Sequence, residues 1–256
     1  MAKTTTVASL GAAFAEQGLR VLLVDLDAQA CLTYSLGVDP EEVAASVHDV
    51  LCGTVTAADA IVPAADGVDL LPATIDLAAA ESVLLPRAGR EHVLATALAE
   101  VSGGYDVVVL DCSPSLGVLT LNALTAADEV VIPLQCEMLS HRGVGQLLDT
   151  IEDVRRILND RLVVRGVLPT MFDARTSHAR AVLEDVGQRY GLPVLEPPIP
   201  RSVRFAEAPA LGSSILSTSR GSKGAAAYRE VALVLLRAWK IGPGRRTTRR
   251  RKAASA

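Results

Sequence analysis

The sequence predicts an α/β fold in which helices cover both faces of a mostly parallel, twisted sheet. Three observations support this prediction. Short apolar runs alternate with amphipathic stretches, two of these runs end in aspartate, and the 256 residues suffice for one large domain with a buried core.

Four apolar runs are predicted strands, because strands buried on both faces have continuous rather than alternating apolar sequences. They are Val21–Val24, Val107–Leu110, Glu129–Pro133 and Leu162–Leu168. Five stretches between and around them are predicted helices, since their apolar residues recur with helical spacing. They are Thr5–Gln17, Arg87–Val101, Gly143–Leu158, Ala179–Tyr190 and Gly224–Trp239.

The composition excludes several classes of protein. Half of the residues are hydrophobic, so the body of the chain is not disordered. No apolar run reaches the roughly 20 residues needed to cross a bilayer, and no secretory signal is evident. Four separated cysteines, Cys31, Cys52, Cys112 and Cys136, form no CxxC pair. We therefore expect reduced thiols in a cytoplasmic protein, without a zinc site or a disulfide framework.

The charges are distributed unevenly along the chain. Seven Lys or Arg and no acid lie between Lys240 and Ala256, so the remaining 239 residues carry 18 basic and 29 acidic side chains. An acidic body repels nucleic acid, and any DNA contact must use a local patch or this tail. We expect one domain over residues 1–241 and a basic, disordered tail over 242–256. Two interpretations of the tail are open: a DNA contact, or a solvated segment with no specific role.

The candidate site residues are the aspartates at the ends of two predicted strands and a Lys-Thr pair at the start of a helix. Asp25 and Asp27 end one predicted strand and Asp111 ends another, at the sheet edge where open parallel sheets bind ligands. For a lone aspartate, a helix cap is the plainer interpretation. Lys3 and Thr4 begin a helix, as do the last residues of a phosphate-binding loop, although a Lys-Thr pair near a chain start is a weak signal.

An ordered set of motifs strengthens the prediction that these residues form a functional site. Together the motifs resemble the ParA/Soj family of deviant Walker ATPases, which carries a KGGxxKTT loop followed by a strand ending in DxDxQ. The resemblance covers about residues 2–238 and implies a P-loop NTPase-like fold. The matching segments are Lys3–Leu10, Val21–Gln29 (VLLVDLDAQ), Leu71–Ala73 (LPA), Val107–Ser115 (VVVLDCSPS), Leu119–Leu124 (LTLNAL), Thr170–Thr176 (TMFDART) and Ile199–Pro209 (IPRSVRFAEAP).

The resemblance implies a role for each residue near the first two motifs. Lys3 matches the phosphate-binding lysine, Thr4 the Mg²⁺ ligand and Thr5 a further phosphate contact. Asp27 matches the residue that orients the attacking water. Asp25 is expected to support the site and the shell around Mg²⁺.

The later motifs imply further contacts. Asp111 resembles the Walker B acid that reaches Mg²⁺ through water. Ser113 and Pro114 match the switch that senses the γ-phosphate. Pro200 and Arg201 lie where the family places its adenine-side loop.

The family also implies a DNA-binding cycle. Arg175 and Arg204 match basic positions that contact DNA, although a solvated surface charge is the plainer interpretation of either arginine. ATP binding is expected to form a sandwich homodimer that binds DNA non-specifically, and hydrolysis to release it. A ParB-like partner is expected to stimulate hydrolysis. The ATP-bound protein would then be associated with the nucleoid.

The sequence departs from the family pattern at its beginning. The family's first strand and the K-G-G residues of the loop are missing, and Met1 stands where valine is expected. Because a GTG valine codon can initiate translation, we expect the true start to lie upstream. Without a central strand and the loop amides, the chain as written is expected to fold poorly and to bind ATP weakly.

Two alternatives remain open at this stage. The basic end lacks the apolar residues of the membrane helix found in septum-positioning relatives, and the paired cysteines of iron–sulfur carriers are absent. The first alternative is a relative with a different cargo. The missing apolar residues count against a membrane-bound relative, and the missing cysteine pair counts against an iron–sulfur carrier. The second is a degenerate paralogue that binds DNA or a partner without hydrolysing ATP.

Overall fold

The computed structural model describes residues 2–135, 140–173, 175–176, 183–184 and 187–242. The predicted tail lies outside these residues except for Gly242, and so does much of the helix predicted over Ala179–Tyr190. No helix in the described ranges is long and apolar enough to cross a membrane.

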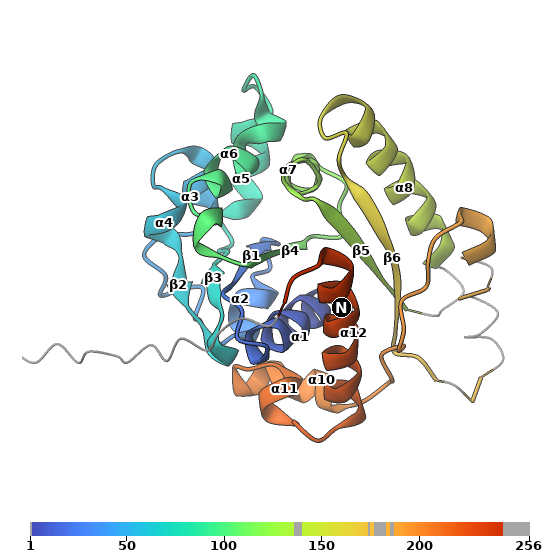
Figure 1. Ribbon diagram of the computed structural model, residues 1–256. Coiled ribbons are helices and arrows are strands. Elements are labelled where there is room, and N and C mark those ends of the chain that lie inside the picture. Colours follow the sequence, from blue (N-terminus) through green and yellow to red (C-terminus); the bar gives the residue numbers. More distant parts are fainter. Residues whose placement is uncertain (1, 136–139, 174, 177–182, 185–186, 243–256) are drawn as a thin grey trace, which may run out of the picture.

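Parallel strands form the centre of the molecule (Figure 1). One sheet has the order β2-β3-β1-β4, in which only β2 is antiparallel, and β5 pairs with β6 in a second parallel sheet. The predicted α/β class with a mostly parallel sheet is therefore confirmed, with the strands in two groups. The strands are β1 Val21–Leu26, β2 Val62–Pro63, β3 Asp69–Leu71, β4 Val107–Cys112, β5 Glu129–Gln135 and β6 Val163–Thr170.

Helices lie on both sides of these strands (Figure 1). The α-helices are α1 Ala2–Glu16, α2 Cys31–Ser35, α3 Val47–Cys52, α4 Ala57–Ala60, α5 Leu77–Leu84, α6 Val93–Ala99, α7 Val118–Ala126, α8 Ser140–Ile157, α10 Arg204–Glu207, α11 Ile215–Thr218 and α12 Lys223–Trp239. Short 3₁₀ helices are η1 Ala65–Gly67, η2 Arg90–His92, η3 Ser102–Gly104 and η4 Ala208–Leu211.

Strand β1 separates two apolar cores. Val21 and Leu23 pack in the core that contains α1 and α12, whereas Leu22, Val24 and Leu26 pack in the core with α3, α5, α6 and α7. This alternation follows from the two-residue period of a strand. All six β1 residues are buried, as expected for a strand covered on both faces.

Helix α1 lies directly against β1. A Cβ atom at Gly11 would stand 2.8 Å from both Cδ atoms of the buried Leu23, so a larger residue there would force Leu23 to shift. In the same core, Phe14 contacts Trp239 of α12 with ring centroids 5.5 Å apart. The buried hydroxyls of Thr6 and Tyr228 are 3.0 Å apart. These contacts fix the direction in which the first turn of α1 points.

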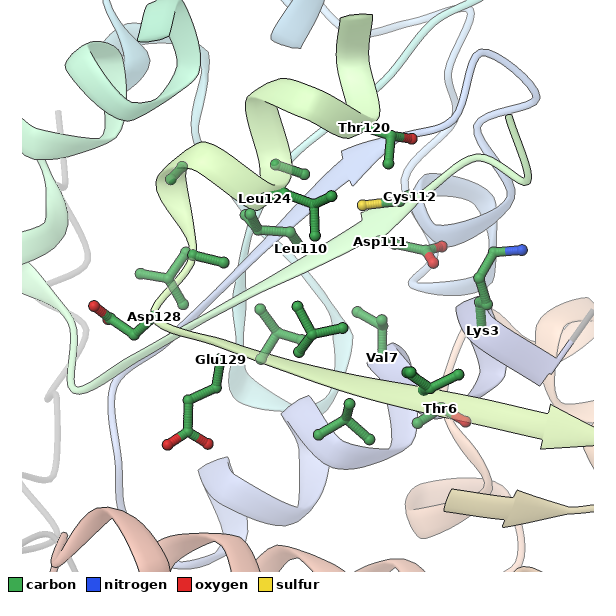
Figure 2. A pocket seen from close by; sticks show the side chains of 18 of the residues that line it. Lys3, Thr6, Val7, Leu110, Asp111, Cys112, Thr120, Leu124, Asp128 and Glu129 are labelled. Atoms are coloured by element: carbon green, nitrogen blue, oxygen red, sulfur yellow. The ribbon is translucent and has the colours of Figure 1, made fainter. Parts of the chain in front are cut away.

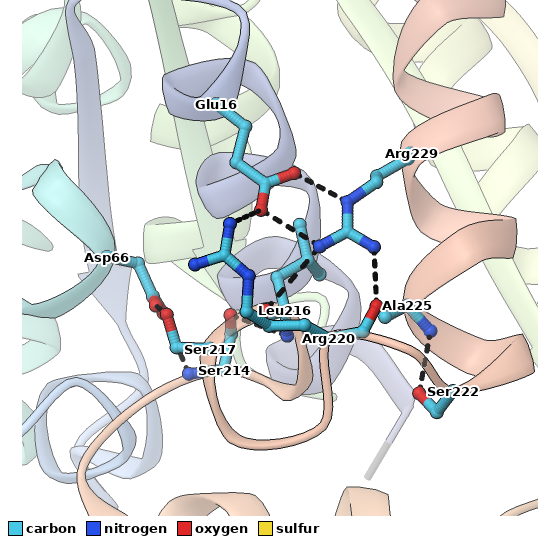
Figure 3. A network of polar contacts seen from close by, with 9 residues as sticks. All are labelled: Glu16, Asp66, Ser214, Leu216, Ser217, Arg220, Ser222, Ala225 and Arg229. Carbon is cyan, nitrogen blue, oxygen red and sulfur yellow. Dashed lines mark hydrogen bonds and ion pairs between the residues drawn. The ribbon is translucent and has the colours of Figure 1, made fainter.

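A polar network fastens the far end of α1 (Figure 3). The Arg229 guanidinium donates to both Glu16 carboxylate oxygens at 2.6 and 2.9 Å and also to the carbonyl of Arg220 at 2.8 Å. Asp66 accepts hydrogen bonds from the Ser214 amide and the Ser217 hydroxyl. The network therefore joins α1, the segment around η1 and the loop before α12.

The helix predicted over Arg87–Val101 is wrong in its first part. Gly89 has a left-handed backbone (φ 68°), and only η2 and then α6 follow it. The Arg87 guanidinium donates to the Leu51 and Cys52 carbonyls at the end of α3. Tertiary contacts to a distant helix therefore replace the local helical pattern.

Replacing Asn122 by alanine is expected to destabilise the protein by about 2 kcal/mol, because three buried hydrogen bonds would be lost. The Asn122 amide accepts from the Leu94 amide at 3.0 Å and donates to the Arg90 and Val118 carbonyls at 2.8 and 2.9 Å. Urea unfolding followed by circular dichroism measures the change. Thr96→Ala on exposed α6 surface is the control, and an equal loss in both variants would contradict this role of Asn122.

Candidate functional site

Two buried carboxylates meet at the ends of adjacent strands. Asp25 of β1 pairs in register with Asp111 of β4, and the two side chains belong to residues that are 0% and 1% exposed. The structure thus brings together the acids that the sequence places at two strand ends. Burial raises the pKa of both carboxyls above the usual range; the charge of Asp27 adds to the rise at Asp25, and the charges of Asp25 and Asp27 add to the rise at Asp111.

Asp25 organises the loop that follows β1. Its Oδ2 accepts hydrogen bonds from the Thr33 amide and hydroxyl at 2.9 and 2.8 Å, and Oδ1 accepts from the Asp27 amide at 3.1 Å. The Thr33 hydroxyl in turn accepts from the Ala73 amide at 3.0 Å. These bonds satisfy Asp25 and tie the segments after β1 and β3 together.

Asp27 stands in a tight turn at the start of that loop. Its side chain accepts from the Gln29 amide at 3.0 Å, and its carbonyl accepts from Ala30, which has a left-handed backbone (φ 50°). The residue is half-buried, and its charge contributes to raising the pKa of Asp111. A water-accessible carboxylate is therefore held beside the two buried ones.

Asp111 has a different environment from Asp25. Neither of its carboxylate oxygens has a hydrogen-bond partner among the described residues. Burial is the main cause that raises its pKa to about 7; the Thr4 hydroxyl and the Lys3 ammonium oppose the shift, although the hydroxyl is not placed for a full hydrogen bond. A buried, unsatisfied carboxylate is costly unless a cation neutralises it.

Lys3 and Asp111 project into the same pocket, from the first turn of α1 and the end of β4 (Figure 2). Amides at the N-terminus of a helix attract anions, and Lys3 and Thr4 lie in the first turn of α1, which begins at Ala2. An acid without a partner, a hydroxyl and a lysine at a helix start fit a Mg²⁺–phosphate group. Magnesium is usually held by few carboxylates together with phosphate oxygens.

The segment after Asp111 lines the same cavity and has its own internal bonds. The Ser113 and Ser115 hydroxyls are 2.9 Å apart, and the Thr120 hydroxyl donates to the Ser115 carbonyl at 2.6 Å. Ser113 and Pro114 both line the cavity. Burial raises the pKa of the neighbouring Cys112 thiol to about 12, so it is a packed thiol rather than a reactive one.

A second cavity of about 640 Å³ contains three other predicted site residues, Arg175, Pro200 and Arg201. Pro200 bridges to Phe172, whose carbonyl accepts from the Arg201 amide at 3.3 Å. Lys3, Asp111, Ser113 and Pro114 line only the first cavity. The other predicted site residues line neither cavity: Thr4, Thr5, Asp25, Asp27 and Arg204.

The two predicted DNA-binding arginines are exposed and already have local contacts. Arg175 forms a two-pronged pair with Asp173 at 3.0 and 2.9 Å, which lowers the pKa of Asp173 to about 2. Arg204 donates to the Ser219 hydroxyl at 3.2 Å. Its side chain does not line either cavity.

Sequence reasoning missed the role of two residues. Thr33 joins Asp25 to Ala73, and Asn122 joins α7 to the start of α6. The available signals were that Ala73, the partner of Thr33, and Asn122 itself lie in matched motifs. Motif matching did not reveal which partners these residues contact.

Comparison with known proteins explains this arrangement. A family profile described as an AAA domain matches residues 1–164. The sporulation initiation inhibitor protein Soj of Bacillus subtilis is 45% identical over 231 residues, which are 90% of this chain and 91% of Soj. The chain belongs to the ParA/Soj family of ATPases.

Other members and neighbours of the ParA/Soj family agree with this assignment. The chromosome partitioning protein ParA of Caulobacter vibrioides (strain NA1000 / CB15N) is 42% identical, covering 90% of this chain and 87% of that protein. A structure of cobyrinic acid a,c-diamide synthase from Mycobacterium smegmatis, solved with an ATP analog and magnesium, is 58% identical with a TM-score of 0.84. It covers 93% of this chain and 91% of that chain. The predicted family and its P-loop NTPase-like fold are confirmed.

Proposed function

We propose that this chain is the nucleotide-binding body of an ATP- and Mg²⁺-dependent partitioning ATPase that serves chromosome or plasmid segregation or cargo positioning. The observation that supports it best is the buried, unsatisfied Asp111 beside Thr4 and Lys3. The ADP- and ATP-analog-bound structures of the similar Mycobacterium smegmatis protein, both with magnesium, also support it.

Each proposed role combines the family resemblance with the position of the residue. Lys3, Thr4 and Thr5 hold phosphate oxygens at the start of α1, and Thr4 and Asp111 hold Mg²⁺, the latter through water. Asp27 orients the water that attacks the γ-phosphorus. As the new P–O bond forms, the bond to the ADP oxygen breaks, giving ADP and phosphate. Bound Mg²⁺ neutralises the charge that develops on the phosphate oxygens.

Three further groups complete the proposed nucleotide site. Asp25 keeps the Asp27 loop in place through its hydrogen bonds to Thr33 and Asp27. Ser113 and Pro114 report the presence of the γ-phosphate. Pro200 and Arg201, in the second cavity, contact the adenine side.

The proposed cycle couples nucleotide to DNA. An ATP-bound homodimer binds DNA phosphates without sequence preference and associates with the nucleoid. Hydrolysis, stimulated by a ParB-like partner, releases it. The chain carries a net charge of −4, so this binding requires local basic groups such as Arg175 and Arg204. Two copies of such a weak patch in a dimer bind far better than one.

Removing either arginine is expected to weaken DNA binding of the ATP-bound protein about 3- to 10-fold. Each lost phosphate contact should reduce the slope of log K against log salt by about 1 per protomer. Fluorescence anisotropy with random-sequence duplexes measures both quantities for Arg175→Ala and Arg204→Ala.

Arg156→Ala is the matched control for these arginine variants. Arg156 is an exposed arginine of α8 paired with Asp153 at 2.7 Å, much as Arg175 pairs with Asp173. The control should leave affinity and salt slope unchanged. Equal weakening by all three substitutions would show that DNA attraction is diffuse rather than located at Arg175 and Arg204.

A second candidate function comes from the name of the Mycobacterium smegmatis neighbour, which suggests ATP-dependent amide formation on a carboxylate. An amide transfer that uses glutamine requires an activated thiol, whereas burial raises the pKa of both Cys31 and Cys112. Cys31 and Cys112 are two of the three cysteines among the described residues, and the Soj and ParA relatives are 45% and 42% identical, so we favour the partitioning function. ATP turnover that rises with cobyrinic acid and glutamine, and not with DNA, would reverse this preference.

A third candidate is a degenerate paralogue that binds DNA or a partner without turnover. The test is an ATP hydrolysis assay on the full product of the native gene. Absence of hydrolysis would favour this third candidate.

A further inference from the structure

Asp66 of η1 holds α11, a helix that is distant from it in the sequence (Figure 3). Its Oδ2 accepts a hydrogen bond from the Ser214 amide at 2.7 Å, and its Oδ1 accepts one from the Ser217 hydroxyl. Ser214 is the N-terminal cap of α11 and is buried, and Ser217 lies within this short helix. One carboxylate therefore fixes the position of α11 from outside the helix.

The backbone of Asp66 has a conformation that few side chains tolerate. Its φ of 59° lies in the left-handed region. Apart from glycine, asparagine and aspartate adopt this region most readily. Position 66 therefore combines a left-handed backbone with a side-chain acceptor, and glycine could satisfy only the first of these requirements.

The far end of α11 supports Arg204, a proposed DNA-binding arginine. Ser219 directly follows α11, and its amide donates to the Ile215 carbonyl at 2.9 Å. Its hydroxyl accepts from Nη1 of Arg204 at 3.2 Å. A guanidinium has several N–H donors, so this bond leaves others free for a phosphate. Because a side chain that is already ordered loses less conformational entropy on binding, the bond to Ser219 prepares Arg204 for a phosphate contact.

Phe205, the neighbour of Arg204, anchors α10 to α12. Its ring packs edge-on against Tyr228 with centroids 5.8 Å apart. A Cβ atom at Gly224 would stand 2.6 Å from the Phe205 ring, so the two helices are in close contact. Loss of the support from α11 should therefore release the Arg204 side chain while α10 keeps its place.

The segment that supports Arg204 is also joined to the candidate nucleotide site. The Ala65 amide, next to Asp66, donates to the Leu36 carbonyl after α2 at 3.2 Å. The backbones of Gly37 and Gly212 touch, since a Cβ atom at Gly37 would stand 3.0 Å from the Gly212 carbonyl oxygen. Helix α2 is itself bound by Asp25. The contacts of α11 thus continue to the strand that carries the acids of the site.

We propose that Asp66 is a positioning residue for DNA binding, which acts through α11 and Ser219 on the Arg204 guanidinium. The inference rests on the proposed function, because it takes Arg204 to be a contact to DNA phosphates. Asp66 itself is half-buried and already bonded to α11, so it acts on DNA only through that arginine.

The test compares Asp66→Gly with Asp66→Asn by fluorescence anisotropy on random-sequence duplexes, with ATP bound. Glycine keeps the left-handed backbone but removes both bonds, whereas asparagine can accept from the Ser214 amide and donate to the Ser217 oxygen. Asp66→Gly is expected to weaken DNA binding about 2- to 10-fold, the entropy cost of one side chain that is no longer ordered in advance. It should also reduce the slope of log K against log salt, as Arg204→Ala does. Asp66→Asn should match the wild type.

Two additions separate positioning from a general loss of stability. Unfolding of part of the protein would lower the apparent affinity but leave the salt slope unchanged. Asp66→Gly added to Arg204→Ala should change neither quantity further, because Asp66 acts through that arginine. If the glycine variant fails to fold, Ser217→Ala takes its place: it removes one bond at an exposed side chain and should give a smaller change of the same sign.

Three outcomes would overturn the inference. Wild-type affinity and slope in Asp66→Gly, with weakened binding in Arg204→Ala, would contradict it while the proposed function stands. A further loss of affinity in the double variant would show that Asp66 acts on DNA binding elsewhere. If Arg204→Ala bound DNA like the wild type, the proposed contact itself would be contradicted, and the inference would fall with it. The arginine variant alone therefore tells a failure of the proposed function from a failure of the inference.

Discussion

Asp111→Asn is expected to make the nucleotide-free protein more stable at pH 8 while it abolishes Mg²⁺-dependent ATP hydrolysis. The pKa of Asp111 is raised from 3.8 to about 7, mainly by burial. Between these values the folded chain binds more protons than the unfolded chain, so the stability contributed by this group falls as pH rises from about 4 to about 7. At pH 8 the buried charge costs up to roughly 4 kcal/mol.

The asparagine variant removes this charge but leaves a buried amide without partners, which costs about 1–3 kcal/mol. The net gain in unfolding free energy at pH 8 should be about 1–3 kcal/mol and should vanish near pH 5, where the wild-type carboxyl is already neutral. Urea titrations at both pH values measure it. Phosphate release measures hydrolysis, which should fall at least about 100-fold.

Asp25→Asn is the matched control, because Asp25 is as buried as Asp111 but accepts three hydrogen bonds. An amide nitrogen would face one of the donating N–H groups, so this variant should lose stability at pH 8. If both variants became less stable to the same degree, Asp111 would not be the unsatisfied acid that we describe.

Lys3→Ala and Asp27→Ala are expected to lower ATP turnover at least about 100-fold for different reasons. Lys3 is proposed to hold phosphate oxygens, so its loss should weaken ATP binding about 10-fold or more. Asp27 is proposed to orient water, so its loss should leave ATP binding within about 2-fold. Variants are expressed from the native gene, and turnover and binding are followed by phosphate release and a fluorescent ATP analog.

Lys240→Ala is the control for the lysine variant, since Lys240 is exposed at the end of α12 and lines neither cavity. It should keep full turnover. Equal turnover in the wild type, Lys3→Ala and Asp27→Ala would count against the enzymatic function and favour a binding module without hydrolysis.

Much of the fold could be predicted because its signals are local. The continuous apolar runs at Val21–Val24 and Val107–Leu110 are strands, and the structure extends each by two residues, so that Asp25 and Asp111 lie one residue before the strand ends. Helix α1 was recognisable by its apolar face and by Gly18 after its end. Strand β3 and helices α5 and α7 were not predicted, because three residues are too few for a pattern and the two helices lack a strong amphipathic signal.

By itself the sequence determined the family, the order of the four long strands along the chain and the identity of the acids near the ends of two of them. Only the tertiary structure decided that Asp25 is satisfied by Thr33 while Asp111 has no hydrogen-bond partner among the described residues, since the two acids occupy equivalent places in the sequence pattern. It also decided that Lys3 and Arg201 line different cavities. Apolar periodicity depends on near neighbours in the chain, whereas hydrogen-bond partners and strand neighbours are selected from residues tens of positions away.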